Sequence, residues 1–425
     1  MNKIRQYFTT LHITRGFFIA LLSSLFIYFN HWGLSHPLPN TIFAFTSLWF
    51  LLQLEQKTWF WYGVFIGIFW FWWIALSLQH YGYAWGFPVG VVIISFIYGS
   101  IFGFSAWISE KIESWTSLPS VFTKSLILLC FSFIHPFNFD WFKPELMFLE
   151  SYLGIEKWQF SLVLLSISLS IWKKNIFFFL LVLLAYSPTK ETNSPVNNHI
   201  QLVTTHTSVK DKWDEALHPK QFKKLFETID RAIDTNKSLI ILPESVFPIF
   251  LNKSQALMHK LHEKAKDISI ITGALYWDGN TPRNSTYIFT KDNIQIANKV
   301  LLVPFGESNP LPNFLSNWVN KVFYDNAIDY EASSDVIDYE VNGQTYRNAI
   351  CFEATSEKLY AKNKNGNYPQ NMIVLSNNGW FSPSTEPTLQ KLLLQYYSKK
   401  YGTTIYHSVN MSDSYSIQNG LTIKE

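Results

Sequence analysis

The chain before about Ser187 is strongly apolar and poor in charge, and this feature restricts the possible fold more than any other. It holds most of the 17 Trp and 37 Phe among the 425 residues. Such segments fill a lipid bilayer, where they must be helical because lipid offers no partner for an unpaired backbone amide. The remainder alternates short apolar runs with polar segments. We therefore predict a transmembrane helical domain at residues 1–187 and a second, soluble domain at residues 188–425.

Seven stretches of the first part lack Asp, Glu, Lys and Arg, and we interpret them as membrane spans. Several fall short of the roughly 20 residues that cross a bilayer, so their bounds are approximate. The stretches are 17–32, 41–52, 60–78, 87–108, 126–139, 160–172 and 176–186. A segment between the fifth and sixth, 135–158, is rich in aromatic residues and predicts an interfacial stretch, or an ordinary loop whose aromatics pack on helix ends.

Basic residues in alternate loops predict the orientation of these spans. Loops with more Lys and Arg stay in the cytoplasm. Lys143 and Lys157 fall on one side, and the other side carries Lys3, Arg5, Arg15, Lys57, Lys111, Lys124, Lys173 and Lys174. Seven spans that start in the cytoplasm place the soluble domain outside. If the short last pair of stretches is a single span, the soluble domain lies inside.

The soluble half alternates strand-like and helix-like patterns, which predicts a layered α/β domain. The strand-like runs are 200–204, 238–242, 268–272, 286–290, 300–303, 346–350, 372–375 and 404–408. Amphipathic helical patterns cover 218–235, 254–266 and 388–400.

Charge and cysteine usage exclude two function classes. A net charge of +3 without a basic stripe does not favour nucleic-acid binding. Cys351 has no His or Cys at metal-ligand spacing, so no metal is predicted, and nothing in the sequence calls for a cofactor. The other cysteine, Cys130, lies in an apolar run, where we expect it to pack as a small hydrophobe.

Three residues of the soluble half stand at positions suited to covalent catalysis. Glu244 follows a buried strand in ILPESVFP, where partial desolvation raises the pKa of a carboxyl towards that of a general base. Lys299 opens NKVLLVPFGE, ahead of a predicted strand, and a lysine in a dry site stabilises an oxyanion. Cys351 begins ICFEATS at a predicted strand-to-helix turn, where a thiol can be deprotonated. Taken singly, each is at least as often structural; the ordered set carries the prediction.

Those segments, together with SNNGWF and the membrane half, resemble the nitrilase or carbon-nitrogen hydrolase superfamily and, within it, the apolipoprotein N-acyltransferases. The resemblance implies an α-β-β-α sandwich with Glu244 as general base, Lys299 as oxyanion stabiliser and Cys351 as nucleophile. It also implies that Glu307 and Glu353 are supporting carboxylates; the alternative for each is an ion pair with a nearby Lys or Arg. Supporting roles extend to Trp380, beside the active site, and to the backbone amide of Phe352, as a second oxyanion donor.

The resemblance further implies a reaction and a location. A phospholipid, expected to be phosphatidylethanolamine, gives an acyl chain to Cys351 as a thioester, and the α-amine of a diacylglyceryl-cysteine on an apolipoprotein accepts it. The protein is expected in the bacterial inner membrane, with its catalytic domain on the periplasmic side. A loop at 310–329 containing Phe314, Trp318 and Phe323 is a candidate lid, or packs as an ordinary helix face.

The sequence departs from the family pattern at three points. Phe352 stands where Tyr is usual, and Asn378 stands in place of the usual Asp of an N-D-x-W-F motif. The sequence also ends at Glu425 without the final membrane helix that many members have, so we expect either a short natural form or a domain whose closing elements are trimmed. Two other functions stay open: a membrane-tethered amidase or nitrilase in which water resolves the acyl-enzyme, and a catalytically silent lipid-binding scaffold.

Overall fold

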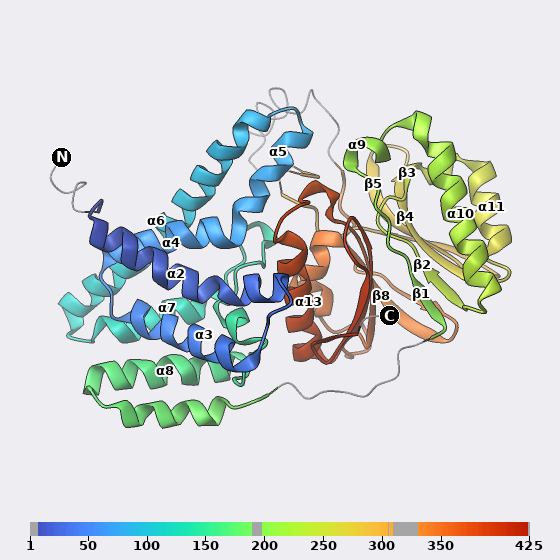
Figure 1. Ribbon diagram of the computed structural model, residues 1–425. Helices are drawn as coiled ribbons and strands as arrows, with labels where there is room; N and C mark the ends of the chain where they lie inside the picture. Colours follow the sequence, from blue (N-terminus) through green and yellow to red (C-terminus); the bar gives the residue numbers. More distant parts are fainter. Residues whose placement is uncertain (1–6, 189–197, 305, 309–329, 424–425) are drawn as a thin grey trace. The chain divides into compact units, whose positions relative to one another are not determined.

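The computed structural model describes residues 7–188, 198–304, 306–308 and 330–423 (Figure 1). Contacts divide the chain into two compact units, which we describe separately. The first unit comprises residues 1–190 and 384–396, and the second comprises residues 191–383 and 397–425. Residues 384–396 therefore pack with the first unit, although they lie beyond the domain boundary predicted at residue 187. The predicted lid at 310–329 lies outside the described residues.

The first unit is helical. Its elements are α2 (Thr10–His31), α3 (Pro37–Leu52), α4 (Gln56–Phe71), η1 (Trp72–Leu76), α5 (Ser77–His80), η2 (Ala84–Gly86), α6 (Phe87–Thr116), α7 (Ser120–Phe131), η3 (Pro136–Asn138), η4 (Pro144–Phe148), α8 (Lys157–Lys173) and η5 (Ile176–Ala185), followed by most of α13 (Glu386–Tyr401). Each of the seven predicted stretches overlaps a helix. Among the described residues, three helical segments are long and apolar enough to cross a membrane: Thr10–His31, Gln56–His80 and Ala84–Thr116.

Small residues let two of these long helices approach closely. A Cβ atom on Gly63 of α4 would lie 2.4 Å from the carbonyl oxygen of Tyr98 on α6, and one on Gly67 would lie 2.7 Å from the Cα of Ser95. From the other side, a Cβ on Gly99 would lie 2.6 Å from Val64 Cγ2. In a membrane, apolar side chains gain little by leaving lipid for a neighbouring helix, so helices associate through close packing instead. Glycines spaced four apart allow this packing because they let two backbones approach.

The aromatic segment between α7 and α8 is largely internal, which favours the alternative of a loop whose aromatics pack against the helices. Trp141 is 2% exposed and Phe148 is fully buried, whereas Trp158 stays on the surface. The buried Glu145 organises this region: its carboxylate accepts hydrogen bonds from Ser132 and from the hydroxyl of Tyr396 at 2.9 Å, and it pairs with Lys157. This polar cluster ties α13 to the other helices of the unit.

Residue Cys130 differs from its prediction. It is exposed on α7 within the first unit, not packed inside it. An apolar run in a membrane helix does not distinguish a side chain that faces protein from one that faces lipid, because both surroundings are apolar.

The second unit is built on two six-stranded sheets, which confirms the predicted α/β class (Figure 1). The first sheet contains β1 (Ile200–Leu202), β2 (Leu239–Ile241), β4 (Ser269–Trp277), β5 (Pro282–Phe289) and β6 (Ile294–Asn298) in that order, with β3 (Phe247–Phe250) on β4. The second has the order β12 (Leu421–Ile423), β11 (Tyr415–Gln418), β10 (Thr404–Asn410), β9 (Asn371–Asn377), β8 (Gln344–Ile350) and β7 (Asp338–Val341). Helical elements are α9 (Val209–Lys212), η6 (Glu215–Leu217), α10 (His218–Asp234), η7 (Leu251–Lys253), α11 (Gln255–Lys264), η8 (Cys351–Thr355), η9 (Glu357–Tyr360) and η10 (Asn378–Trp380).

Two apolar cores explain the layers of this unit. One joins α10 and α11 to the outer face of the first sheet through residues such as Phe226, Leu261 and Ile270. The other lies between the sheets, where Ile241 and Ile271 of the first sheet belong to one cluster with Ile373 and Tyr406 of the second. Strands buried on both faces read as continuous apolar runs, such as the one that contains β2.

Candidate active site

The strand directions bring several predicted residues to one edge of the sandwich. In the first sheet β2 is parallel to β4, β5 is antiparallel to β4, and β6 is antiparallel to β5, so β2 and β6 end at the same edge. Glu244 follows β2 and Lys299 follows β6. In the second sheet β8, β9 and β10 are parallel, and Cys351 follows β8. A parallel bridge between Thr205, after β1, and Asn410, at the end of β10, aligns the two sheets, so their carboxyl ends share this edge.

Glu244 is held in a tight turn after β2. The next residue, Ser245, has a positive φ of 47°, and a Cβ atom on Gly273 of β4 would lie 2.4 Å from the Ser245 nitrogen. Only glycine permits this approach of the two backbones. Glu244 is 8% exposed, and its carboxylate accepts a hydrogen bond of 2.7 Å from Asn284. Burial raises the pKa of Glu244, against the opposing effect of Lys299, as a general base requires.

Lys299 forms a buried ion pair with Glu307, the second predicted carboxylate. Their N···O distance is 2.8 Å, and the side chain of Lys299 is 1% exposed. Burial by itself would lower the pKa of Lys299, but the carboxylates of Glu307 and Glu244 raise it, so the lysine stays an ammonium. Glu307 is fixed in turn by the backbone N–H of Val303 at 2.9 Å and by the amide of Asn284 at 3.0 Å.

The strand predicted at 300–303 is not formed. Lys299 follows β6, which ends at Asn298, instead of preceding a strand. The backbone N–H groups of Val300 and Leu301 are drawn to the carboxylate of Glu353, at 2.8 and 3.1 Å, and not to a neighbouring strand. A distant carboxylate thus overrides the local apolar pattern.

Cys351 opens the short helix η8 directly after β8. Its φ is +52°, a conformation that costs a non-glycine residue roughly 1–3 kcal/mol and that recurs at functional sites. The predicted strand-to-helix turn is therefore present, with a 3-10 helix in place of an α-helix. The thiol interacts electrostatically with the ammonium groups of Lys299 and Lys212, so the nucleophile candidate and the lysine candidate lie within electrostatic range of each other.

Glu353 links the Lys299 segment to the Cys351 turn. It is 1% exposed and accepts the backbone N–H of Ile350 at 2.7 Å as well as those of Val300 and Leu301. Burial raises the pKa of Glu353 to about 7, although Lys299 and the three backbone donors favour its charged form. The sequence alternative, an ion pair of Glu353 with a nearby basic side chain, is replaced by this set of backbone contacts.

We expect Glu353→Gln to lower the free energy of unfolding by about 2 kcal/mol. The amide NH2 of Gln is a donor, so it cannot accept a hydrogen bond from the backbone N–H groups that Glu353 binds. At least one of these N–H groups would therefore lose its acceptor. Chemical unfolding of the detergent-solubilised chain measures the effect, with the exposed Glu340→Gln as a neutral control. The native protein binds the Glu353 proton more tightly than the unfolded chain does. The proton on Glu353 therefore stabilises the native protein fully at pH values below the ordinary glutamate pKa. This stabilisation is lost as the pH rises through about 7, and the variant lacks it.

Two residues of this edge are not predicted by the sequence. Asn284, at the start of β5, donates to both Glu244 and Glu307 through one amide nitrogen. Lys212, in α9, donates to the backbone carbonyl of Glu244 at 2.9 Å. Neither belongs to a segment with a catalytic motif, and their only sequence signal is a polar residue next to an apolar run.

The last two predicted residues, Trp380 and Phe352, lie on short helices that follow strands of the second sheet. Trp380 ends η10, directly after β9, at the same edge as Cys351 because β8 and β9 are parallel. Phe352 is buried as the second residue of η8. The catalytic and supporting roles of these residues stay predictions. Among the described residues, no group of three or more His, Cys, Asp or Glu side chains gathers as metal ligands would.

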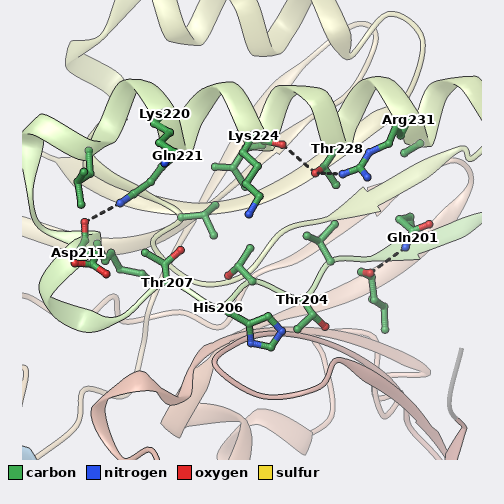
Figure 2. Close-up of a pocket in the computed structure, with 18 of the residues that line it drawn as sticks. Gln201, Thr204, His206, Thr207, Asp211, Lys220, Gln221, Lys224, Thr228 and Arg231 are labelled. Atoms are coloured by element: carbon green, nitrogen blue, oxygen red, sulfur yellow. Dashed lines mark hydrogen bonds between the residues drawn. The ribbon is translucent and has the colours of Figure 1, made fainter.

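A separate cleft of about 750 Å³ lies between α10 and residues 201–207 (Figure 2). Lys224 points into it from α10, and His206 faces it from the opposite wall. None of Glu244, Lys299 and Cys351 lines this cleft, so its size does not identify it as the catalytic site. Lys212 is the residue of its wall that also contacts Glu244.

Comparison with known families first defines the helical unit. Residues 10–189 match the family model of the apolipoprotein N-acyltransferase integral membrane domain. The protein is therefore a multi-pass membrane protein that carries an α/β domain, as predicted.

Full-length relatives define the family. An apolipoprotein N-acyltransferase of Wolinella succinogenes is 38% identical over 403 residues, which cover 93% of this chain and 94% of that protein. Proteins of the same name from Campylobacter jejuni and Helicobacter pylori are 34% and 33% identical, covering 94% and 90% of this chain and 88% of each relative. The chain belongs to the apolipoprotein N-acyltransferase family and is an acyltransferase, which confirms the resemblance seen in its motifs.

Solved structures similar to the second unit include a CN-hydrolase superfamily protein of Xanthomonas campestris, with a TM-score of 0.40 and 17% identity. The match spans 53% of this chain and 86% of the Xanthomonas protein. An amidase from Nesterenkonia has a TM-score of 0.39 and 12% identity. The match spans 55% of this chain and 88% of the amidase.

Proposed function

We propose that this protein transfers a fatty acyl chain from a phospholipid to the α-amine of the diacylglyceryl-cysteine of an apolipoprotein, with Cys351 holding the chain as a thioester. The observation that carries the proposal is the buried network at the sheet edge. It combines a carboxylate of raised pKa, Glu244, with the charged pair Lys299 and Glu307 and with the strained turn at Cys351. These are the parts that nucleophilic acyl transfer needs.

In the first half-reaction the thiol of Cys351 gives its proton to Glu244, and the sulfur attacks the ester carbonyl carbon of the phospholipid. Negative charge develops on the carbonyl oxygen, where the ammonium of Lys299 stabilises it. The carbon–oxygen ester bond then breaks. The leaving oxygen takes the proton back from Glu244, which yields a lysophospholipid and a thioester.

In the second half-reaction the amine of the apolipoprotein attacks the thioester carbonyl. Glu244 accepts a proton from the amine, the carbon–sulfur bond breaks, and the thiolate regains its proton. The new bond is an amide. Because the acyl chain is stored covalently, two bulky lipid substrates use the same site one after the other.

The proposal includes a preferred donor and a location. We propose phosphatidylethanolamine as the donor, by analogy with the family, and the bacterial inner membrane as the location. The catalytic domain lies on the periplasmic side, as the distribution of basic loop residues favours.

Intact-mass analysis of the purified chain tests the function. After incubation with isotopically labelled phosphatidylethanolamine we expect one acyl adduct on Cys351, removable by hydroxylamine. Addition of a diacylated lipopeptide with a free α-amine should discharge the adduct and give a triacylated peptide, whereas an α-N-acetylated lipopeptide should not. Absence of the adduct in a folded preparation contradicts the proposal. Release of free fatty acid independent of the lipopeptide favours an amidase-like hydrolase instead.

A further inference from the structure

Lys212 is a buried cation whose charge the proposed mechanism does not use. Its side chain is 2% exposed, and its ammonium donates to the backbone carbonyl of Glu244 at 2.9 Å. Among the described residues, no carboxylate forms an ion pair with it. A buried ammonium without a paired carboxylate is costly, because burial removes its hydration without returning a full counter-charge. Such a group calls for an anion that is present at some stage of the protein's function.

The backbone around Lys212 is held from both sides. Its N–H donates to the carbonyl of Ser208 at 2.9 Å, and its own carbonyl contacts the ring nitrogen Nε2 of His218 at 3.1 Å. Asp211, the preceding residue, accepts through its carbonyl from the side chain of Gln221 at 2.7 Å. The ammonium is thus directed at the Glu244 turn by a fixed stretch of chain and not by a freely moving side chain.

The charges on the far side of the Glu244 turn identify the missing anion. The ammonium of Lys212 interacts electrostatically with the carboxylate of Glu244 and with the sulfur of Cys351. The charged groups that interact electrostatically with Lys212, Lys299 or Glu244 are these three residues themselves, the carboxylates of Glu307 and Glu353, and Cys351. Lys299 already has Glu307 as its partner at 2.8 Å. Glu244 and Cys351 are the anionic groups that act on Lys212. Once Glu244 has taken the thiol proton, the thiolate of Cys351 is the anion that balances this ammonium.

We propose that Lys212 is a second cationic positioning residue of the acyl-transfer site, whose ammonium holds the carbonyl of Glu244 and stabilises the thiolate of Cys351. This role rests on the proposed function of Cys351 as nucleophile. The hydrogen bond fixes the direction in which the Glu244 side chain leaves its turn. The charge favours loss of the thiol proton, which the neighbouring carboxylates would otherwise oppose.

The pH range of this effect follows from the lysine itself. Burial lowers the pKa of Lys212 to about 8, although Glu244 and Cys351 act to raise it. Below that pH Lys212 is charged and favours the thiolate, and above it the lysine loses its proton and the effect fades. The thiolate of Cys351 therefore loses this counter-charge as the pH rises through the pKa of Lys212.

Alkylation of Cys351 by iodoacetamide across pH 5 to 10 tests the role without requiring acyl transfer. The full chain is used in detergent on a Cys130→Ala background, so Cys351 is the one reactive thiol. In Lys212→Met we expect the midpoint of the rate against pH to rise by about one pH unit, which is about a tenfold loss of rate below both midpoints, with the alkaline plateau unchanged. Lys212→Arg, which keeps the charge, should restore most of the shift.

Two further variants separate charge, hydrogen bond and folding. Lys212→Gln keeps a donor for the Glu244 carbonyl but lacks charge, so its midpoint should rise as in Lys212→Met. Lys210→Met removes an exposed lysine of the same helix and should leave the midpoint in place. A midpoint within about 0.2 pH units of the parent in both neutral Lys212 variants overturns the proposal. So does recovery of the parent midpoint in Lys212→Gln alone, which would leave only the hydrogen bond.

The alkylation experiment and the acyl-adduct experiment test the two proposals independently. A shifted midpoint with no acyl adduct would support the charge effect of Lys212 and reject the proposed transfer. An acyl adduct with an unshifted midpoint would support the transfer and reject the role of Lys212. If Lys212→Met alkylates at the rate of unfolded chain, the comparison of Lys212→Gln with Lys212→Arg decides the question.

Discussion

Cys351→Ala should lower the rate of acyl transfer by at least about 10³-fold while the chain still inserts into membranes and folds. The reason is that no other described group supplies a nucleophile at the end of β8, and removal of a covalent nucleophile leaves only the contribution of binding and oxyanion stabilisation. The rate is measured by formation of triacylated lipopeptide from a diacylated one. Substrate binding, followed with a fluorescent phospholipid, should persist.

The second cysteine provides the matched control for this prediction. Cys130→Ala removes a thiol that is exposed on α7 of the membrane unit, and it should leave the rate within about twofold of the parent. Substantial turnover by Cys351→Ala would mean that the amine attacks the phospholipid directly, and the thioester proposal would then be wrong.

Lys299→Met should reduce both activity and stability. Loss of an oxyanion donor typically costs about 10²- to 10³-fold in kcat. Removal of one member of a buried ion pair also leaves Glu307 unpaired, which costs roughly 3–5 kcal/mol of the free energy of unfolding. Transfer assays and chemical unfolding of the same preparation measure the two effects, and Lys291→Met, an exposed lysine before β6, should change neither.

A double variant distinguishes the two roles of Lys299. Lys299→Met combined with Glu307→Gln removes the unpaired charge, so most of the lost stability should return. Activity should stay low, because no ammonium remains to face the developing oxyanion. Recovery of activity together with stability would show that Lys299 only holds the fold.

Particular residues show why the sequence revealed some of the site and missed the rest. Glu244 follows β2, an apolar strand that is visible as a continuous run because both of its faces are buried. Cys351 follows β8, whose sequence QTYRNAI mixes polar and apolar residues, so the motif after it carries the prediction. Lys299 stands next to an apolar run, 300–303, which predicts a strand that the structure does not form. The hydrogen bonds that prevent this strand come from Glu353, which lies far along the chain and has no local signature.

Contacts between distant segments also explain the two residues that were missed. Asn284 joins Glu244 to Glu307 because β5 begins at the edge where β2 and β6 end. Lys212 reaches Glu244 from α9, on a different element. Neither contact follows from spacing or propensity, since each depends on strand order and on the packing of helices against the first sheet.

The sequence by itself determined the division into a membrane part and an α/β part, the family, and the order of the three candidate catalytic residues. These properties follow from local hydropathy and short motifs, which survive without knowledge of neighbours. Only the tertiary structure decided that Lys299 pairs with Glu307, that Glu353 binds three backbone N–H groups, and that Lys212 joins the site. The physical reason is that a charge removed from water must find its partners in space, and strand pairing brings those partners from positions that the sequence keeps far apart.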